Sequence, residues 1–213
     1  LANQIKIYCP DLKTVLSPAF RFQDLLIPKS SNRISKKFTI LIILPIFKID
    51  YTMILNLFGL VKTQISDYNL LIKTHPGSNH NFVSKILSDN NLSDFKTNKN
   101  IKDALAISNL VITSASSAAL ESVFSGKPTL LVSNGSGILK NPIPYNISVE
   151  LSSVCYDVND IVSKVKYFMS LSKQQLFDLK KLSNFNISDY IEPNTLLSTQ
   201  NFLGLNKSAV KNE

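Results

Sequence analysis

LVITSASSAALESVFSGKPTLLVS, residues 110–133, has the pattern of a strand, a polar loop, a helix and a second strand. β-Branched residues and leucines dominate 110–113 and 129–133, which predicts two short buried strands. Between them, 117–125 has helical spacing, and Gly126 directly after it is typical of a helix end. This order predicts a βαβ unit, whose two strands are parallel.

The same alternation continues on both sides of this stretch. We expect six strands, at 40–46, 70–74, 94–97, 110–113, 129–133 and 154–156. We expect the intervening helices at 51–64, 80–88, 101–107, 117–125 and 159–170. The pattern predicts an α/β fold, a Rossmann-like doubly wound parallel sheet with helices on both faces and strand order 3-2-1-4-5-6.

The predicted sheet divides the chain into four segments. Residues 1–37 are expected to be the tail of a preceding N-terminal domain plus a linker, and 38–172 the Rossmann-like domain itself. Residues 173–205 are expected to form closing C-terminal helices, and 206–213 a disordered tail. The sequence starts at Leu1 in the middle of what reads as a further strand, residues 5–8, so we expect a fragment.

Composition restricts the function classes. The chain has a net charge of +8, but its 23 Lys and Arg residues are scattered and lack the basic stripe of a nucleic-acid groove. Cys9 and Cys155 lack metal-ligand spacing, which favours a reducing compartment. The apolar run 38–47 is too short to span a bilayer. We therefore expect a cytoplasmic protein without nucleic-acid partners, and the basic charge leaves open a peripheral position at the cytoplasmic membrane face.

Polar residues follow three of the predicted strands. In a doubly wound sheet, ligands bind at the carboxyl ends of the strands, near the point where the strand order reverses. The candidate binding residues lie in these loops or in the helix after the second loop: Thr74, His75, Pro76 and Gly77; Ser114, Ser116, Ser117 and Glu121; and Ser133, Asn134 and Gly135. Their joint placement predicts one ligand site at this edge.

The residue types indicate a phosphate ligand. Ser116 and Ser117 open a helix, where hydroxyls and free N–H groups bind anions. His75 can donate to a phosphate oxygen and stabilise a departing phosphate, and Glu121 can accept hydrogen bonds from ribose hydroxyls. Taken singly, each has a structural alternative: Ser116 a helix cap, His75 a solvated strand terminator, Glu121 a first-turn acid and Gly135 a turn residue.

Several familiar sites are missing from the sequence. It has no G-x-G-x-x-G after the first strand, no Walker lysine motif and no G-x-S-x-G elbow. We therefore expect no cofactor and no metal, and a phosphate site built from serines.

The pattern of residues 72–76, 110–117, Glu121 and 126–128 resembles the C-terminal domain of GT-B glycosyltransferases, in particular bacterial sialyltransferase-like and capsule or surface carbohydrate biosynthesis proteins. In bacterial sialyltransferases an HP motif and a Ser-Ser motif hold the phosphate of a CMP-sugar. The resemblance therefore implies this role for His75, Ser116 and Ser117. It implies a cytoplasmic transferase that uses a nucleotide-sugar donor and a glycan or glycolipid acceptor, as in capsule or lipopolysaccharide synthesis.

The resemblance also implies that the catalytic acid or base comes from an N-terminal domain outside this sequence. Three alternatives stay open. The first is a CDP-glycerol glycerophosphotransferase of the teichoic-acid type, although Ser114 and Ala115 replace the Asp and Tyr of its motif. The second is a non-catalytic nucleotide-binding module of a carbohydrate assembly complex, and the third is an epimerase acting on a UDP-sugar.

Overall fold

The computed structural model describes residues 7–11, 17, 37–133, 141–144, 147, 150–184 and 194–205. The chain divides into two compact units, Leu1–Lys29 with Asn186–Glu213, and Ser30–Phe185. In the first unit, helix α10 (Leu196–Phe202) begins with a capping box between Thr195 and Ser198. The second unit contains the sheet and the candidate site. The predicted tail 206–213 lies outside the described residues.

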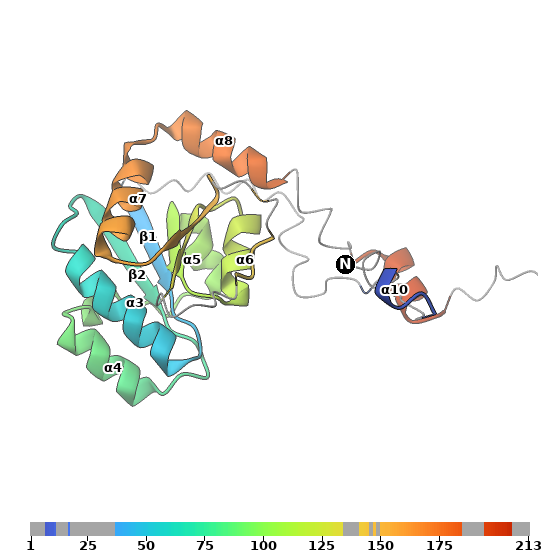
Figure 1. Cartoon of the computed structure of the whole chain (residues 1–213), viewed down its shortest axis with the longest axis horizontal. Coiled ribbons are helices and arrows are strands. Elements are labelled where there is room, and N and C mark those ends of the chain that lie inside the picture. The colour runs from blue at the N-terminus through green and yellow to red at the C-terminus, as the bar shows by residue number, and fades with distance from the viewer. Residues whose placement is uncertain are drawn as a thin grey trace, which may run out of the picture. The chain divides into compact units, whose positions relative to one another are not determined.

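The second unit is built on a parallel sheet of five strands in the order β2-β1-β3-β4-β5 (Figure 1). The strands are β1 (Phe38–Ile43), β2 (Tyr68–Lys73), β3 (Leu110–Thr113), β4 (Thr129–Val132) and β5 (Ser152–Cys155). Ile40 of β1 pairs with Leu70 on one side and with Leu110 on the other. The α/β class and the parallel direction predicted from the sequence are confirmed.

The prediction of a sixth strand at 94–97 is wrong. Ser93–Phe95 form a short 3₁₀ helix, and only Lys96 makes a bridge to Ile72 of β2. Ser and Asp disfavour strands, and Lys96 is exposed, so burial does not favour a longer pairing. The bridge nevertheless lies beside β2, where the order 3-2-1-4-5-6 places the third strand.

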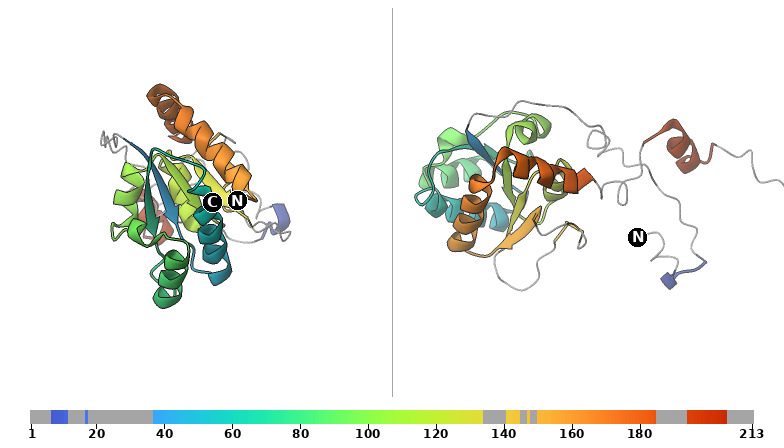
Figure 2. Two further views of the ribbon diagram at one scale, coloured as in Figure 1. Left: turned by 90° about the vertical axis from the view of Figure 1, so that its left-hand side faces the viewer. Right: turned by 90° about the horizontal axis from the view of Figure 1, so that it is seen from above.

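Helices cover both faces of the sheet, as Figures 1 and 2 show. They are α3 (Lys48–Val61), α4 (His80–Asp89), α5 (Ile101–Ile107), α6 (Ser117–Phe124), α7 (Val158–Ser170) and α8 (Lys173–Asn184). Helix α3 packs against α4 and α7, whereas α5 and α6 pack on the sheet and α8 against α6. Helix α3 begins three residues before its predicted start at Tyr51. No helix among the described residues is long and apolar enough to cross a membrane.

The core explains why the strands are so apolar. Parallel strands covered on both faces bury every side chain, and β3 and β4 are buried along their whole length. On one face, Leu41, Ile43 and Val111 form a cluster with Ala104 and Leu105 of α5 and Ala118 of α6.

Helix α6 ends where the sequence predicts. Gly126 has φ 70°, the left-handed conformation that glycine adopts most readily. Its N–H donates to Val123 O at 2.9 Å, and Lys127 N–H donates to Ser122 O at 3.0 Å. These two bonds form a Schellman motif, which turns the chain directly into β4.

Cys155 at the end of β5 gives the core a measurable pH dependence. Its side chain is fully buried, and this burial raises the pKa of the thiol from 9.0 to about 12. Above pH 9 the unfolded chain loses this proton while the folded chain keeps it, so the thiol lowers stability as pH rises.

We predict that raising the pH from 8 to 10 lowers the free energy of unfolding of the wild type by about 1.4 kcal/mol more than that of Cys155→Ala. Urea titrations of both proteins at both pH values measure this difference. An identical pH dependence would show that the thiol titrates normally. Because Cys9 is exposed and Cys155 is buried, we expect an alkylating reagent to modify Cys9 in the folded protein and to leave Cys155 unmodified.

Candidate functional site

The loops that leave β1, β2 and β3 meet at the carboxyl edge of the sheet. They meet there because the strands are parallel, and hydrogen bonds connect their ends. Leu44 N–H donates to Lys73 O at 2.9 Å, which joins the end of β1 to the end of β2. Ser133 N–H, directly after β4, donates to Cys155 O of β5 at 3.0 Å. The ends of β2, β3 and β4, from which the predicted loops leave, therefore lie on one edge of the sheet.

Thr113, the last residue of β3, connects β3 to β1. Its side chain is fully buried, and its hydroxyl donates to Ile43 O of β1 at 2.8 Å. The hydroxyl oxygen of Thr113, Oγ1, also lies 3.3 Å from Ser116 Oγ. Thr113 is absent from the sequence-derived set of site residues, although a threonine that ends an otherwise aliphatic strand was a signal for it.

Ser116 occupies the N-cap position of α6 but does not cap the helix with its side chain. Three other helices of this unit are capped by a side chain, whereas α3, which follows Phe47, is not. Asn79 accepts from Phe82 N–H of α4, Asn100 caps α5, and Asp157 caps α7. Because the Ser116 hydroxyl lies beside Thr113 instead, the first turn of α6 keeps N–H groups without a side-chain cap, and these can bind an anion.

Ser114 and Ser78 have buried hydroxyls without a hydrogen-bond partner among the described residues. Ser114 is 2% exposed and precedes the N-terminus of α6, and Ser78 is 6% exposed and follows β2. Leaving such a hydroxyl unsatisfied costs about 1–3 kcal/mol. A ligand or water at this edge that bonds either hydroxyl recovers part of that cost. Ser117, by contrast, is exposed.

His75 lies in a tight turn after Thr74. Ser78 N–H donates to His75 O at 3.0 Å, which closes the turn around Pro76 and Gly77. Gly77 N–H donates to the ring nitrogen Nδ1 of His75 at 3.0 Å. The ring is partly exposed, so it is held by its own loop and accessible at this edge.

Glu121 and Ser133 are both largely buried, at 9% and 8% exposed. Glu121 lies one turn after Ser117 on α6, as predicted. The structure therefore places nine of the eleven predicted binding residues in the carboxyl-edge loops or in the helix that starts there. Asn134 and Gly135 lie outside the described residues.

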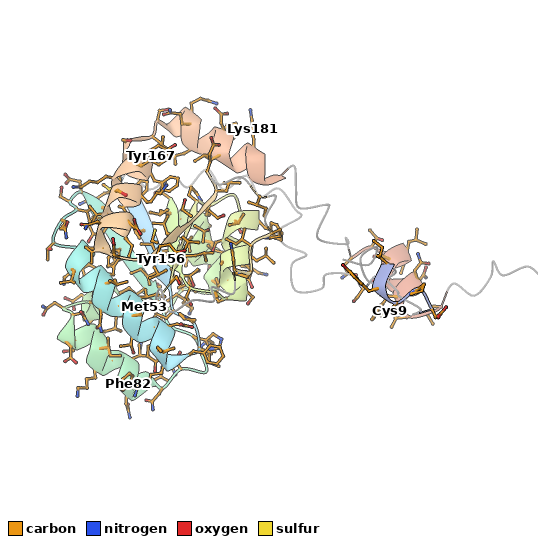
Figure 3. All side chains as sticks on the ribbon, viewed as in Figure 1. Cys9, Met53, Phe82, Tyr156, Tyr167 and Lys181 are labelled. Atoms are coloured by element: carbon orange, nitrogen blue, oxygen red, sulfur yellow. The ribbon has the colours of Figure 1, made fainter. Side chains whose placement is uncertain are left out.

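The first turn of α3 adds charged residues that the sequence reasoning did not select. Lys48 Nζ lies 3.8 Å from the centroid of the Phe82 ring of α4, which is labelled in Figure 3. Asp50 is partly buried, and this burial raises the pKa of its carboxyl group above the usual value. Within the described residues, no three His, Cys, Asp or Glu side chains gather in a group that could hold a metal ion.

No protein-family model and no curated protein sequence matches the chain. Its structure is nevertheless similar to solved structures. WaaG, a glycosyltransferase involved in lipopolysaccharide biosynthesis, matches with a TM-score of 0.52 and 9% identity, over 85% of this chain and 49% of WaaG. A variant of the wall teichoic acid polymerase TagF matches with a TM-score of 0.55 and 13% identity, over 89% of this chain and 50% of TagF.

The domain has a GT-B-like fold. A co-structure of S. aureus MnaA with UDP is also similar to this GT-B-like domain, with a TM-score of 0.54 and 15% identity, over 84% of this chain and 50% of MnaA. The chain spans about half the length of these proteins. At such low identity the similarity establishes the fold, and the ligand has to be argued from the site.

We predict that Thr113→Val lowers the free energy of unfolding by about 1 kcal/mol, because it removes a buried donor while keeping the side-chain shape. Thr63→Val is the matched control, since the Thr63 hydroxyl also donates to a backbone carbonyl at 2.8 Å, that of Leu60, but is exposed. We expect a change within about 0.5 kcal/mol for this control. Urea denaturation measures both values, and equal losses would contradict a special role for the Thr113 link.

Proposed function

We propose that the chain is the donor-binding half of a glycosyltransferase. The donor is a CMP-activated sugar of the sialic-acid or Kdo type, and the acceptor is a surface polysaccharide or glycolipid. The observation that carries the proposal is the N-terminus of α6, where the Ser116 side chain does not cap the helix and Ser114 has a buried hydroxyl without a hydrogen-bond partner among the described residues.

The chemistry of this edge suits a phosphate group. Helix N–H groups and the helix dipole stabilise negative charge without a metal ion. Ser117 is exposed in the first turn, so its side chain is accessible to a ligand. The sheet order reverses between β1 and β3, and α6 begins beside this point.

His75 has the second role in the proposed mechanism. During transfer, the bond between the anomeric carbon of the sugar and a phosphate oxygen breaks, and the electron pair leaves with the phosphate. A ring N–H of His75 stabilises the charge that develops on that oxygen. Thr74, Pro76 and Gly77 shape the same loop, and the base that activates the acceptor comes from outside this chain.

In this proposal, the nucleoside of the donor binds to other residues than the phosphate does. Glu121 accepts hydrogen bonds from the ribose hydroxyls, and Ser133, Asn134 and Gly135 contact the nucleoside. We place the transfer in the cytoplasm, at the membrane face, where the sugar passes to the acceptor and the nucleotide is released. The acceptor is a glycan or glycolipid, and the chain has no nucleic-acid partner.

The second candidate function is transfer of glycerol phosphate from CDP-glycerol. The observation that favours it is the similarity to TagF, which includes a TagF structure soaked with CDPG at a TM-score of 0.54. Both candidate donors carry a cytidine nucleotide. They differ in the number of phosphates, because a CMP-sugar has one phosphate and CDP-glycerol has two. A non-catalytic nucleotide-binding module is the candidate from another class.

We predict that the chain binds CMP more tightly than UDP or GDP in calorimetric titrations. We expect His75→Ala and the double variant Ser116→Ala/Ser117→Ala each to weaken binding about tenfold or more, because each removes hydrogen bonds to a charged group. His80→Ala and Ser163→Ala are the matched controls. His80 and Ser163 are exposed, and we expect these variants to bind within about twofold of the wild type.

Tighter binding of CDP than of CMP would favour the CDP-glycerol candidate. If none of the four nucleotides bound, or if the control variants weakened binding as much as the site variants, the assignment of this edge would be wrong.

A further inference from the structure

The His75 ring is oriented by the backbone of its own loop. Gly77 N–H donates to His75 Nδ1 at 3.0 Å, and a nitrogen that accepts a hydrogen bond cannot carry a proton. The neutral ring therefore carries its proton on Nε2, the nitrogen at the far end of the imidazole. A histidine without such a partner exchanges between both tautomers.

From this geometry we infer that His75 is locked as the Nε2–H tautomer before any ligand arrives, and that Nε2–H is the group that donates to the ligand phosphate. The Gly77 backbone amide is then a positioning group, because it acts through His75. This inference rests on the proposed function for its ligand, but the tautomer is a property of the ligand-free protein.

Close packing explains why a glycine provides this amide. A Cβ at position 77 would lie 3.2 Å from Ile46 Cδ1 and 3.4 Å from His75 Nδ1. Ile46 follows β1, so the segment after β1 lies beside the turn after β2. A Cβ at position 77 would require the Ile46 side chain to shift by a few tenths of an ångström, whereas glycine leaves both neighbours in place.

A fixed tautomer prepares His75 for phosphate binding. A neutral ring with a fixed donor stabilises a phosphate through one directed hydrogen bond, and no rotation or proton exchange is needed when the ligand arrives. The cost of choosing the tautomer is met during folding. His75 then needs only its Nε2 end at the ligand, while Nδ1 stays in the turn.

The first experiment is ¹⁵N NMR of the two imidazole rings in the ligand-free chain at a pH where both are neutral. The sequence contains only two histidines, so His80, exposed in the first turn of α4, is an internal control. We expect His75 to show a pyridine-like Nδ1 and a pyrrole-like Nε2, and His80 to show averaged signals. A His75 ring that is averaged like His80, or protonated at Nδ1, overturns the inference.

The second experiment separates the two ring nitrogens by substitution, with CMP as the probe. Asn places a polar atom near Nδ1 and can still accept from Gly77 N–H, whereas Gln reaches the position of Nε2 and offers an N–H donor. We expect His75→Gln to bind CMP within about threefold of the wild type and His75→Asn to lose about tenfold. Equal affinities, or tighter binding by His75→Asn, overturn the role of Nε2–H.

Failures of the inference and of the proposed function are distinguishable. If the wild type binds no nucleotide, the proposed function is wrong, and the ligand-free spectrum still decides the tautomer. If CMP binds and His75 shows mixed tautomers, the proposed function stands and the inference of a single fixed tautomer is wrong.

Discussion

The buried hydroxyl of Thr113 is the link on which the geometry of the site depends. It donates to Ile43 O across the pair of strands where the sheet order reverses. The Ser116 hydroxyl lies beside it and therefore does not accept from the N–H groups of α6. One side-chain interaction thus holds two strand ends together and leaves a helix N-terminus open to an anion.

The fold could be predicted because its main signals are local and periodic. Apolar runs such as Leu110–Thr113 are long enough to indicate buried strands, and Gly126 marks the end of α6 by a conformation that few other residues adopt. The strand predicted at 94–97 failed because its four residues include a single apolar side chain, Phe95, which is too little pattern to separate a strand from a 3₁₀ turn. Here the pairing stops at Lys96, which is exposed.

The site was predictable only in part. Parallel strands put the loops after β2 and β3 on one edge, so the placement of His75, Ser114 and Ser116 follows from the topology. The topology does not predict where each hydroxyl points. The same sequence around Ser116 is compatible with a hydroxyl that caps α6 and with one that contacts Thr113. The orientation of the His75 ring depends on the hydrogen bond from Gly77 N–H, which is a feature of the folded turn that the residue types alone do not show.

In the proposed function, the first turn of α6 binds the nucleotide phosphate. Backbone amide NMR during a titration with CMP tests it most directly, because Ser117 and Ala118 report on this turn and Asp160, whose N–H is bonded to Asp157, reports on a capped helix start. We expect large, saturable shifts at Ser117 and Ala118 and little change at Asp160. Shifts that leave α6 unaffected, or that are equal at both helix starts, would contradict it.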